Sequence, residues 1–234
     1  MDRFVVYDDV SFIKQGWINR NRILVNGAPH MFTMPLSGAG SFTSINAIEL
    51  GREYALWRSK FLRTLMQAYG KAPHHASAMA AVEEVLRPDR TNLSELLVSG
   101  LRVVMEYRTS GPSRSRACNL RKFEPHRAGW LLDICAKEGA SDYVNPIGGK
   151  ELYSKAAFAD RGIKLWFVRS LLKAYPQFGG DFQPGLSILD AMMFLPPSEL
   201  KAMLNDHTWN ELHWWVLPGW SAGPEALRIR WRWR

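Results

Sequence analysis

The hydrophobic pattern of the chain switches repeatedly between the period of a strand and that of a helix. The segment from Phe4 to Val10 is rich in Val and aromatic residues, and its nearly unbroken apolar run predicts a strand buried on both faces, as in a parallel sheet. Shorter runs of the same kind predict further strands at 30–36, 45–50, 103–107, from 143, and at 163–168.

Helical spacing is clearest between Trp57 and Tyr69, where large apolar residues recur every four positions. Asn92 and Glu95 stand three residues apart ahead of a Leu-rich stretch, which predicts a capping box at the start of a helix. The same spacing argument predicts helices at 75–86, 93–101, 130–138, 151–160, 188–195 and 198–204.

Strands and helices alternate along the chain, so we predict an α/β fold with a mostly parallel sheet and flanking helices in a single three-layer domain. We place this domain at residues 1–205 and a Trp/Arg-rich C-terminal extension at residues 206–234. Residues 110–125 are interpreted as a basic loop, because they combine Gly, Pro and Ser with no periodicity.

The composition is that of an ordinary globular protein, with 234 residues of which 47% are hydrophobic and 22% charged. No apolar run approaches the ~20 residues that span a bilayer, and the N-terminus lacks the zones of a signal peptide. We therefore expect a cytoplasmic protein. Cys118 and Cys135 show neither metal-ligand nor disulfide spacing, and the six His form no ligand pair. No metal site is predicted, and no cofactor is identified.

The net charge of +8 favours an anionic partner, but the excess is concentrated in two segments. Residues 114–127 carry five basic side chains against Glu124, and residues 228–234 alternate Arg with Trp. Aromatic and cationic side chains together can stack and neutralise nucleic acid. One hypothesis is therefore a nucleic-acid-binding or DNA-base-modifying protein that uses this loop and tail.

Two adjacent carboxylates, Asp8 and Asp9, stand at the end of the first predicted strand. A carboxylate at the C-terminal end of a buried parallel strand faces the crevice in which open α/β sheets bind ligands. Neighbouring strand residues point to opposite faces, so we expect one of the pair to act on a ligand and the other to cap the following turn. A structural role for both stays open at this point.

A run of amide and guanidinium groups follows, formed by Asn19, Arg20, Asn21 and Arg22, with Lys14 upstream. If the run is extended, the two Arg share one face and the two Asn share the other. Two guanidiniums on one face form a candidate anion clamp, because their planar forks suit phosphate or carboxylate. An exposed edge strand with solvated Arg side chains is the alternative.

A third candidate is the diglycine formed by Gly148 and Gly149, between a predicted strand and the helix expected from residue 151. Backbone amides in such a place can approach an anion, and Lys150 adds a cation. The segment matches neither GxGxxG nor a Walker motif, so a plain turn remains the alternative. Gln177 and Asp190 are further polar candidates in apolar surroundings, with a capping role as the alternative for Asp190.

Four segments, YDDVSFIKQGWINRNRI, LLDICAKEGASDYVNPIGGKELY, GIKLWF and YPQFGGDFQPGLSILD, occur in this order over roughly residues 2–195. Together they resemble the WbqC-like family, because the Asn-Arg run, the Gly-Gly-x-x-x-Tyr loop and the Pro-x-Leu-Ser-Ile-Leu-Asp segment occur in one chain. Tyr143 and Tyr153, which flank the diglycine, complete the set of expected substrate contacts.

This family is linked to bacterial gene clusters for O-antigen and other surface polysaccharides, including lipopolysaccharide. The resemblance therefore implies a transferase that acylates or aminoacylates an amino sugar carried on a nucleotide. Asp8 or Asp9 would accept the proton of the attacking amine, and Arg20 and Arg22 would position the phosphates.

Two departures from the family pattern qualify this expectation. Family members open with a strand and a motif such as Gln-Pro-x-Tyr-Leu-Pro-Trp, and this chain starts after the place where that element is expected to end. Trp130 stands where a basic side chain is expected. A non-catalytic, ligand-binding remnant of the family is therefore a further alternative.

Overall fold

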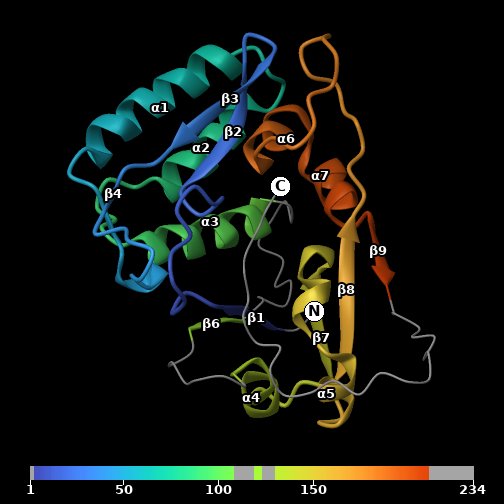
Figure 1. The fold of residues 1–234 in the computed structure, drawn as a ribbon. Coiled ribbons are helices and arrows are strands. Elements are labelled where there is room, and N and C mark those ends of the chain that lie inside the picture. Colours follow the sequence, from blue (N-terminus) through green and yellow to red (C-terminus); the bar gives the residue numbers. More distant parts are fainter. Residues whose placement is uncertain (1–2, 108–118, 123–129, 211–234) are drawn as a thin grey trace.

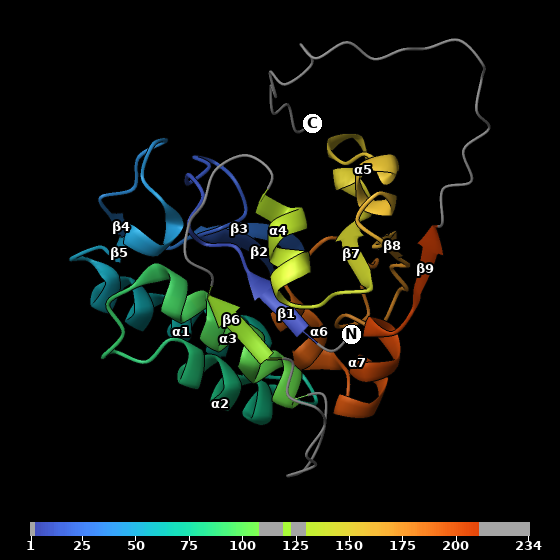
Figure 2. The same cartoon turned by 90° about the horizontal axis from the view of Figure 1, so that it is seen from below.

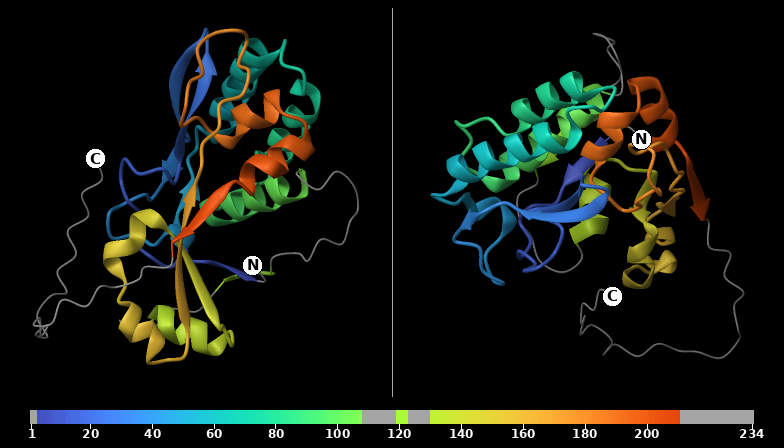
Figure 3. Two further views of the ribbon diagram at one scale, coloured as in Figure 1. Left: turned by 90° about the vertical axis from the view of Figure 1, so that its right-hand side faces the viewer. Right: turned by 90° about the horizontal axis from the view of Figure 1, so that it is seen from above.

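The computed structural model describes residues 3–107, 119–122 and 130–210 (Figure 1). Its elements gather into two parts. We call the first the helical region (residues 10–107 and 171–206) and the second the sheet region (residues 130–170 and 207–210). Figures 1 and 3 show strands β1 and β6 lying between the two.

A β-hairpin opens the helical region. Strands β2 (Arg20–Val25) and β3 (Ala28–Thr33) pair in antiparallel register. The turn between them consists of Asn26 and Gly27, with φ of 50° and 76°. An Asn-Gly pair favours this tight turn because both residues adopt left-handed backbone conformations at low cost. Arg20, Asn21 and Arg22 lie in β2, so this part of the Asn-Arg run is extended, which was the condition for the two Arg to share one face.

Helix α1 (Tyr54–Tyr69) packs on the hairpin through the apolar stripe expected from the sequence. The Phe32 ring centroid of β3 lies 4.5 Å from that of Phe61, and the Trp57 and Phe61 rings stack at 5.0 Å. Such aromatic pairs stabilise the fold beyond the burial of their area. The other α-helices of this region are α2 (His75–Val85), α3 (Leu93–Tyr107), α6 (Ile188–Phe194) and α7 (Pro197–Leu204).

Helix α3 confirms one local prediction and corrects another. The amide of Glu95 donates to Asn92 Oδ1 at 3.2 Å, so Asn92 caps the helix as expected. The strand predicted at 103–107 is wrong, because α3 continues to Tyr107. Val104 and Tyr107 pack against the same core as the first turns of the helix. The β-branched residues of this stretch therefore follow tertiary packing rather than their own strand propensity.

The sheet region is built on strands β7 (Asp142–Pro146), β8 (Lys164–Ser170) and β9 (His207–Asn210). β7 and β8 are parallel, whereas β9 adds to β8 in the antiparallel direction. Helices α4 (Trp130–Lys137) and α5 (Lys155–Ala159) lie next to the sheet (Figure 1). Its buried core consists of Cys135, Phe158, Ile163, Leu165 and Phe167.

The remaining strands are short. β1 (Arg3–Val6) pairs in parallel with β6 (Asn119–Lys122), which lies inside the segment interpreted as a loop. β4 (Leu36–Ser37) and β5 (Glu49–Leu50) form an antiparallel pair, with the 3₁₀ helix η1 (Ile45–Ala47) just before β5.

The α/β class is confirmed, but a mostly parallel sheet in a three-layer domain is not. The described strands are divided among small sheets of mixed orientation, partly because the Asn-Gly turn makes β2 and β3 a hairpin. The predicted boundary between a domain at 1–205 and an extension at 206–234 stays a prediction, since residues 211–234 lie outside the described residues. Within the described part of the chain, no helix is both long and apolar enough to cross a membrane.

Candidate functional site

The first candidate site begins where β1 ends. Asp8 is 4% exposed, and its carboxylate accepts a hydrogen bond from the hydroxyl of Ser94, which is 1% exposed in the first turn of α3. The carbonyl of Asp8 also accepts from the amide of Asn46 at 2.8 Å. Asp8 therefore has a structural role and anchors the end of β1 to the helical region. This contact is long-range, and differs from the cap of the following turn that was expected for one of the two carboxylates.

Asp9 lies in a different environment. It is half-buried, and it follows the exposed side chain of Tyr7 by two residues. Burial raises the pKa of the Tyr7 phenol, and the charge of Asp9 and the neighbouring Tyr153 raise it further. Both groups therefore lie within electrostatic reach of Tyr7. Of the two predicted catalytic carboxylates, Asp9 is the one that is not closed off by the helical region.

Three tyrosines join the end of β1 to the sheet region. The rings of Tyr143 and Tyr153 meet edge to face at 6.0 Å, and Phe158 stacks on Tyr143 at 5.4 Å. Burial raises the pKa of Tyr143 far above its ordinary value, and Tyr153, Cys135 and Tyr7 add to the shift. We call Tyr7, Tyr143 and Tyr153 the tyrosine cluster. A tyrosine is protonated at neutral pH even at its ordinary pKa, and the upward shifts leave this unchanged, so these phenols can donate hydrogen bonds.

The diglycine differs locally from its prediction. Gly148 and Gly149 lie within the 3₁₀ helix η2 (Ile147–Leu152), and the next α-helix begins only after Ser154, whose hydroxyl accepts from the amide of Ala157 at 3.4 Å. The helix predicted at 151–160 is therefore present but starts later than expected, at Lys155, and the diglycine does not directly precede its N-terminus.

A close approach explains one of these glycines. A Cβ atom at Gly149 would lie 3.1 Å from Asn145 Nδ2, so the side chain of Asn145 occupies the space that a larger residue would need. Lys150 is exposed beside it. The segment thus presents one cation and one amide side chain at the end of β7.

The two arginines of the predicted clamp lie on one face of β2, as expected, but their partners differ. The Arg20 and Arg22 guanidiniums lie 5.8 Å and 5.1 Å from the centroid of the Trp17 ring. Arg20 also donates to the carbonyls of Gln15 and Gly16, so it closes the preceding turn. For the Arg22 guanidinium, the described residues supply no hydrogen-bond or ion-pair partner. Arg22 is therefore the one whose donors remain for a ligand.

The amide side chains of the same run serve the backbone. Asn19 Nδ2 donates to the carbonyl of Met34 at 2.8 Å, and Asn21 Oδ1 accepts from the amide of Arg22 at 2.8 Å. Lys14 is exposed upstream of the turn. The predicted substrate contacts of Asn19 and Asn21 remain untested by these bonds, which account for one polar atom of each side chain.

Gln177 and Asp190 meet at a buried polar centre. The Asp190 side chain is 0% exposed and accepts hydrogen bonds from Tyr69 at 2.8 Å, Tyr175 at 2.7 Å and Gln177 at 2.6 Å. The Tyr69 hydroxyl accepts in turn from the amide of Leu24 in β2 at 2.7 Å. We call this group the Asp190 centre. Both oxygens of Asp190 are occupied by these donors, so a ligand could reach the carboxyl group only through its neighbours.

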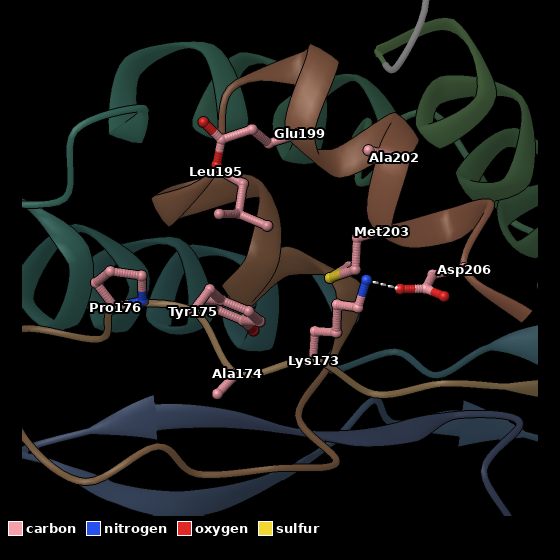
Figure 4. Close-up of a pocket in the computed structure, with 9 residues that line it drawn as sticks. All are labelled: Lys173, Ala174, Tyr175, Pro176, Leu195, Glu199, Ala202, Met203 and Asp206. Atoms are coloured by element: carbon pink, nitrogen blue, oxygen red, sulfur yellow. Dashed lines mark ion pairs between the residues drawn. The ribbon is translucent and has the colours of Figure 1, made fainter.

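A hollow of ≈ 290 Å³ lies beside that centre, between the segment after β8 and the helices α6 and α7. Figure 4 shows the ion pair between Lys173 and Asp206 at its edge and Tyr175 in its wall. No predicted site residue lines it. The lining residues are Lys173, Ala174, Tyr175, Pro176, Leu195, Glu199, Ala202, Met203 and Asp206.

The predicted residues therefore fall into three places: the end of β1 with the tyrosine cluster, the hairpin, and the Asp190 centre. Within the described residues, no hydrogen bond, ion pair or ring contact joins Arg20 or Arg22 to the diglycine. The described part of the chain also contains no group of three or more His, Cys, Asp or Glu that could hold a metal ion.

Sequence reasoning missed Tyr7, Trp17 and Ser94. Tyr7 lay inside the segment that predicted the first strand, and no site role was predicted for Trp17. A signal for Trp17 existed, since an aromatic residue within reach of two closely spaced Arg can accept cation–π contacts. Ser94 carried no such signal, because its partner Asp8 is remote in sequence.

Comparison with known proteins identifies the family. The model of the "WbqC-like protein family" matches residues 1–202. A relative from Mycobacterium tuberculosis (strain ATCC 25618 / H37Rv), named "Uncharacterized protein Rv1507c", is 28% identical over 202 residues, which cover 82% of this chain and 83% of the relative. No solved structure matches the chain. The chain therefore belongs to the WbqC-like protein family, as its motifs indicated.

Proposed function

We propose that this member of the WbqC-like family is a transferase of surface-polysaccharide biosynthesis that acylates or aminoacylates the amine of a nucleotide-linked amino sugar. One observation carries the proposal. Asp9, a carboxylate that is only half-buried, lies beside the tyrosine cluster at the meeting point of β1 and the sheet region. A base next to protonated phenols suits a ligand that is rich in hydroxyl groups and carries an amine.

Different residues bind the sugar and the phosphates of the ligand. The phenols of Tyr7 and Tyr153 contact sugar hydroxyls, because each phenol can donate and accept a hydrogen bond. Lys150 and the amides of Gly148 and Gly149 contact the phosphates. A phosphate contact by Arg22 stays a prediction from sequence, since its guanidinium lies on the hairpin and no described contact joins it to the diglycine.

The chemistry requires one proton acceptor. The amine nitrogen attacks the carbonyl carbon of an activated acyl or aminoacyl donor, so a C–N bond forms and the bond to the donor's leaving group breaks. The Asp9 carboxylate accepts the proton that the nitrogen loses, and this proton then passes to the leaving group. Asp8 acts indirectly, because its hydrogen bond to Ser94 holds the chain on which Asp9 is placed.

Isothermal titration with UDP-glucosamine tests the site. Replacing Tyr153 by Phe removes one hydrogen-bonding group and is expected to weaken binding about fivefold. Asp9→Asn keeps the shape of the side chain and is expected to change affinity by about twofold or less, since the carboxylate acts in the reaction rather than in binding. Asp160→Asn, at an exposed carboxylate just after α5, is the matched control.

Transfer is measured separately by mass spectrometry of the sugar after incubation with acyl thioesters and activated amino acids. Wild-type protein should yield an amide product, and Asp9→Asn should not. Binding without product from any donor would support the ligand-binding remnant instead. Absence of UDP-glucosamine binding, with phosphate-containing analogues also failing to bind, would reject the site itself.

The nucleic-acid alternative depends on the basic side chains of residues 114–127 and 228–234, and these lie outside the described side chains. It therefore stays a prediction from sequence. A salt titration of polynucleotide affinity separates it from the proposed function, because counterion release makes such binding fall steeply with salt.

A further inference from the structure

The first third of the chain contains a long stretch without acidic residues. Residues 10–48 include Lys14, Arg20 and Arg22 but neither Asp nor Glu. Two loops of this stretch also expose large apolar side chains, with Phe42 99% exposed, Trp17 56% and Ile13 43%. Exposed apolar side chains that gather on one surface commonly mark an interaction site.

These loops lie side by side. Ser11 and Ser44 form an isolated β-bridge, and the amide of Phe12 donates to the carbonyl of Thr43 at 2.8 Å. The first loop then turns back through a hydrogen bond from Gly16 to Ile13. Figures 2 and 3 show the loop before β2 and the loop after β4 projecting from the same side of the molecule. Their tips therefore face the same surroundings.

We propose that this side of the molecule docks on the headgroup region of an anionic lipid bilayer. We call the residues involved the loop surface: Ile13, Lys14, Trp17, Arg22 and Phe42. The proposal goes beyond the transferase function, because it concerns where the protein sits rather than what it converts.

Two kinds of interaction favour binding to the bilayer. Phe42 and Trp17 would exchange contact with water for contact with acyl chains, and an indole ring with its polar N–H suits the boundary between the two. Lys14 and Arg22 would gain attraction to the negative surface potential of the bilayer, and both can extend their charged ends into the headgroup layer. Apolar anchors surrounded by cations are the pattern of proteins that lie on membranes without crossing them.

Other occupants fit less well. A second copy of the chain docked face to face would bring the cations of both loop surfaces together, which is unfavourable. A small nucleotide could contact Trp17 and Arg22, but it would leave Phe42 in water, because that side chain projects almost fully from its own loop. A bilayer is wide enough to meet both loops at once.

Co-sedimentation of the full-length protein with vesicles tests the proposal. Vesicles of phosphatidylglycerol mixed with phosphatidylcholine should bind the wild type, and vesicles of phosphatidylcholine alone should bind it far less. Phe42→Ser is expected to lower the partition coefficient about tenfold, and Lys14→Ala about fivefold. Phe42→Trp should retain binding. Leu172→Ser, at a 73% exposed apolar residue in the segment after β8, is the matched control.

Phe42 is not part of the proposed transferase site, so Phe42→Ser should still bind UDP-glucosamine, and the two proposals can fail independently. Every variant retains the Trp/Arg-rich residues 228–234. Equal vesicle binding by wild type and Phe42→Ser would therefore mean that another part of the chain binds the membrane, and it would overturn the proposal. It would equally be overturned if vesicles bound no protein while sedimentation showed Phe42-dependent self-association.

Discussion

The helical region and the sheet region organise their interiors in opposite ways. The helical region closes a large apolar cluster around the Asp190 centre, where Tyr69, Tyr175 and Gln177 donate to one buried carboxyl group. The buried cluster of the sheet region is much smaller and consists of Cys135, Phe158, Ile163, Leu165 and Phe167. Its tyrosines lie at the margin of that small core, half in contact with solvent.

This difference separates stability from function. Sites that bind ligands are commonly drawn from the less stable parts of a protein, because binding requires accessible and adjustable groups. The candidate base Asp9 and the tyrosine cluster lie next to the smaller core, whereas the Asp190 centre is sealed within the larger one. We expect native-state hydrogen exchange to open the amides of β7 and β8 at lower free energy than those of α1.

Removal of the Asp190 carboxyl group is expected to have the largest effect on stability. Asp190→Ala leaves the hydroxyls of Tyr69 and Tyr175 and the amide of Gln177 without their acceptor, so we expect a loss of about 4 kcal/mol in the free energy of unfolding. Urea denaturation followed by circular dichroism measures it.

Two single-hydroxyl variants sharpen the result. Tyr69→Phe should cost more than Tyr175→Phe, because Tyr69 also satisfies the amide of Leu24 and is fully buried. Asp160→Ala, at an exposed carboxylate, should leave the midpoint unchanged. A loss for Asp190→Ala no larger than that control would mean that the Asp190 centre does not stabilise the helical region.

In the smaller core, Phe167→Ala should cost about 3 kcal/mol, since Phe167 is 1% exposed at the middle of β8. We expect the loss to appear first in the hydrogen exchange of β7 and β8, with α1 amides protected as in the wild type. Equal acceleration in both regions would show that the chain unfolds as one cooperative unit. The two regions would then not differ in their free energies of local opening.

A local change at the edge of the larger core should have a smaller effect. Asn92→Ala removes the cap of α3 and should lower the free energy of unfolding by about 1 kcal/mol. Asn92→Asp, which retains a side-chain acceptor, should recover most of it. The measurement is thermal unfolding of the wild type and the two variants at one pH. Identical midpoints would show that the Asn92 cap does not stabilise α3.

The smallest effect concerns acid pH in the sheet region. Hydrogen bonds from Ser141 and Trp166 lower the pKa of Asp142 below its ordinary value of about 3.9. The stabilisation is therefore fully present above that value and disappears as pH falls through the lowered pKa. Asp142→Asn should be slightly less stable than wild type at neutral pH, and the gap should close in acid. A gap independent of pH between 7 and 2 would contradict this assignment.

Patterns of residues close together in the sequence predicted the elements that depend on contacts between near neighbours. The four-residue spacing up to Tyr69 gave α1, and the Asn92 cap marked the start of α3, because each signal lies within one or two helical turns. The Asn-Gly turn also carried its signal in the sequence, although the strand before it was not recognised as half of a hairpin.

Long-range pairings were beyond such patterns. Tyr69 and Asp190 are 121 residues apart, and Ser94 and Asp8 are 86 apart, so neither contact leaves a trace in local spacing. The prediction of where α3 ends was wrong for the same reason, because Val104 and Tyr107 pack against core residues that are distant in sequence. For the candidate site, the sequence indicated Asp9 and Tyr153, but which carboxylate is closed off depended on Ser94.

The hydroxyl of Tyr69 has a consequence for biosynthesis of the chain itself. It links the amide of Leu24, made early by the ribosome, to a carboxyl group that emerges only near the end of translation. N-terminal segments fold first when they can, yet this hairpin cannot complete its anchorage until α6 has left the exit tunnel. A nascent polypeptide arrested before residue 190 should therefore hold β2 loosely and be cut there by proteases that spare the finished product.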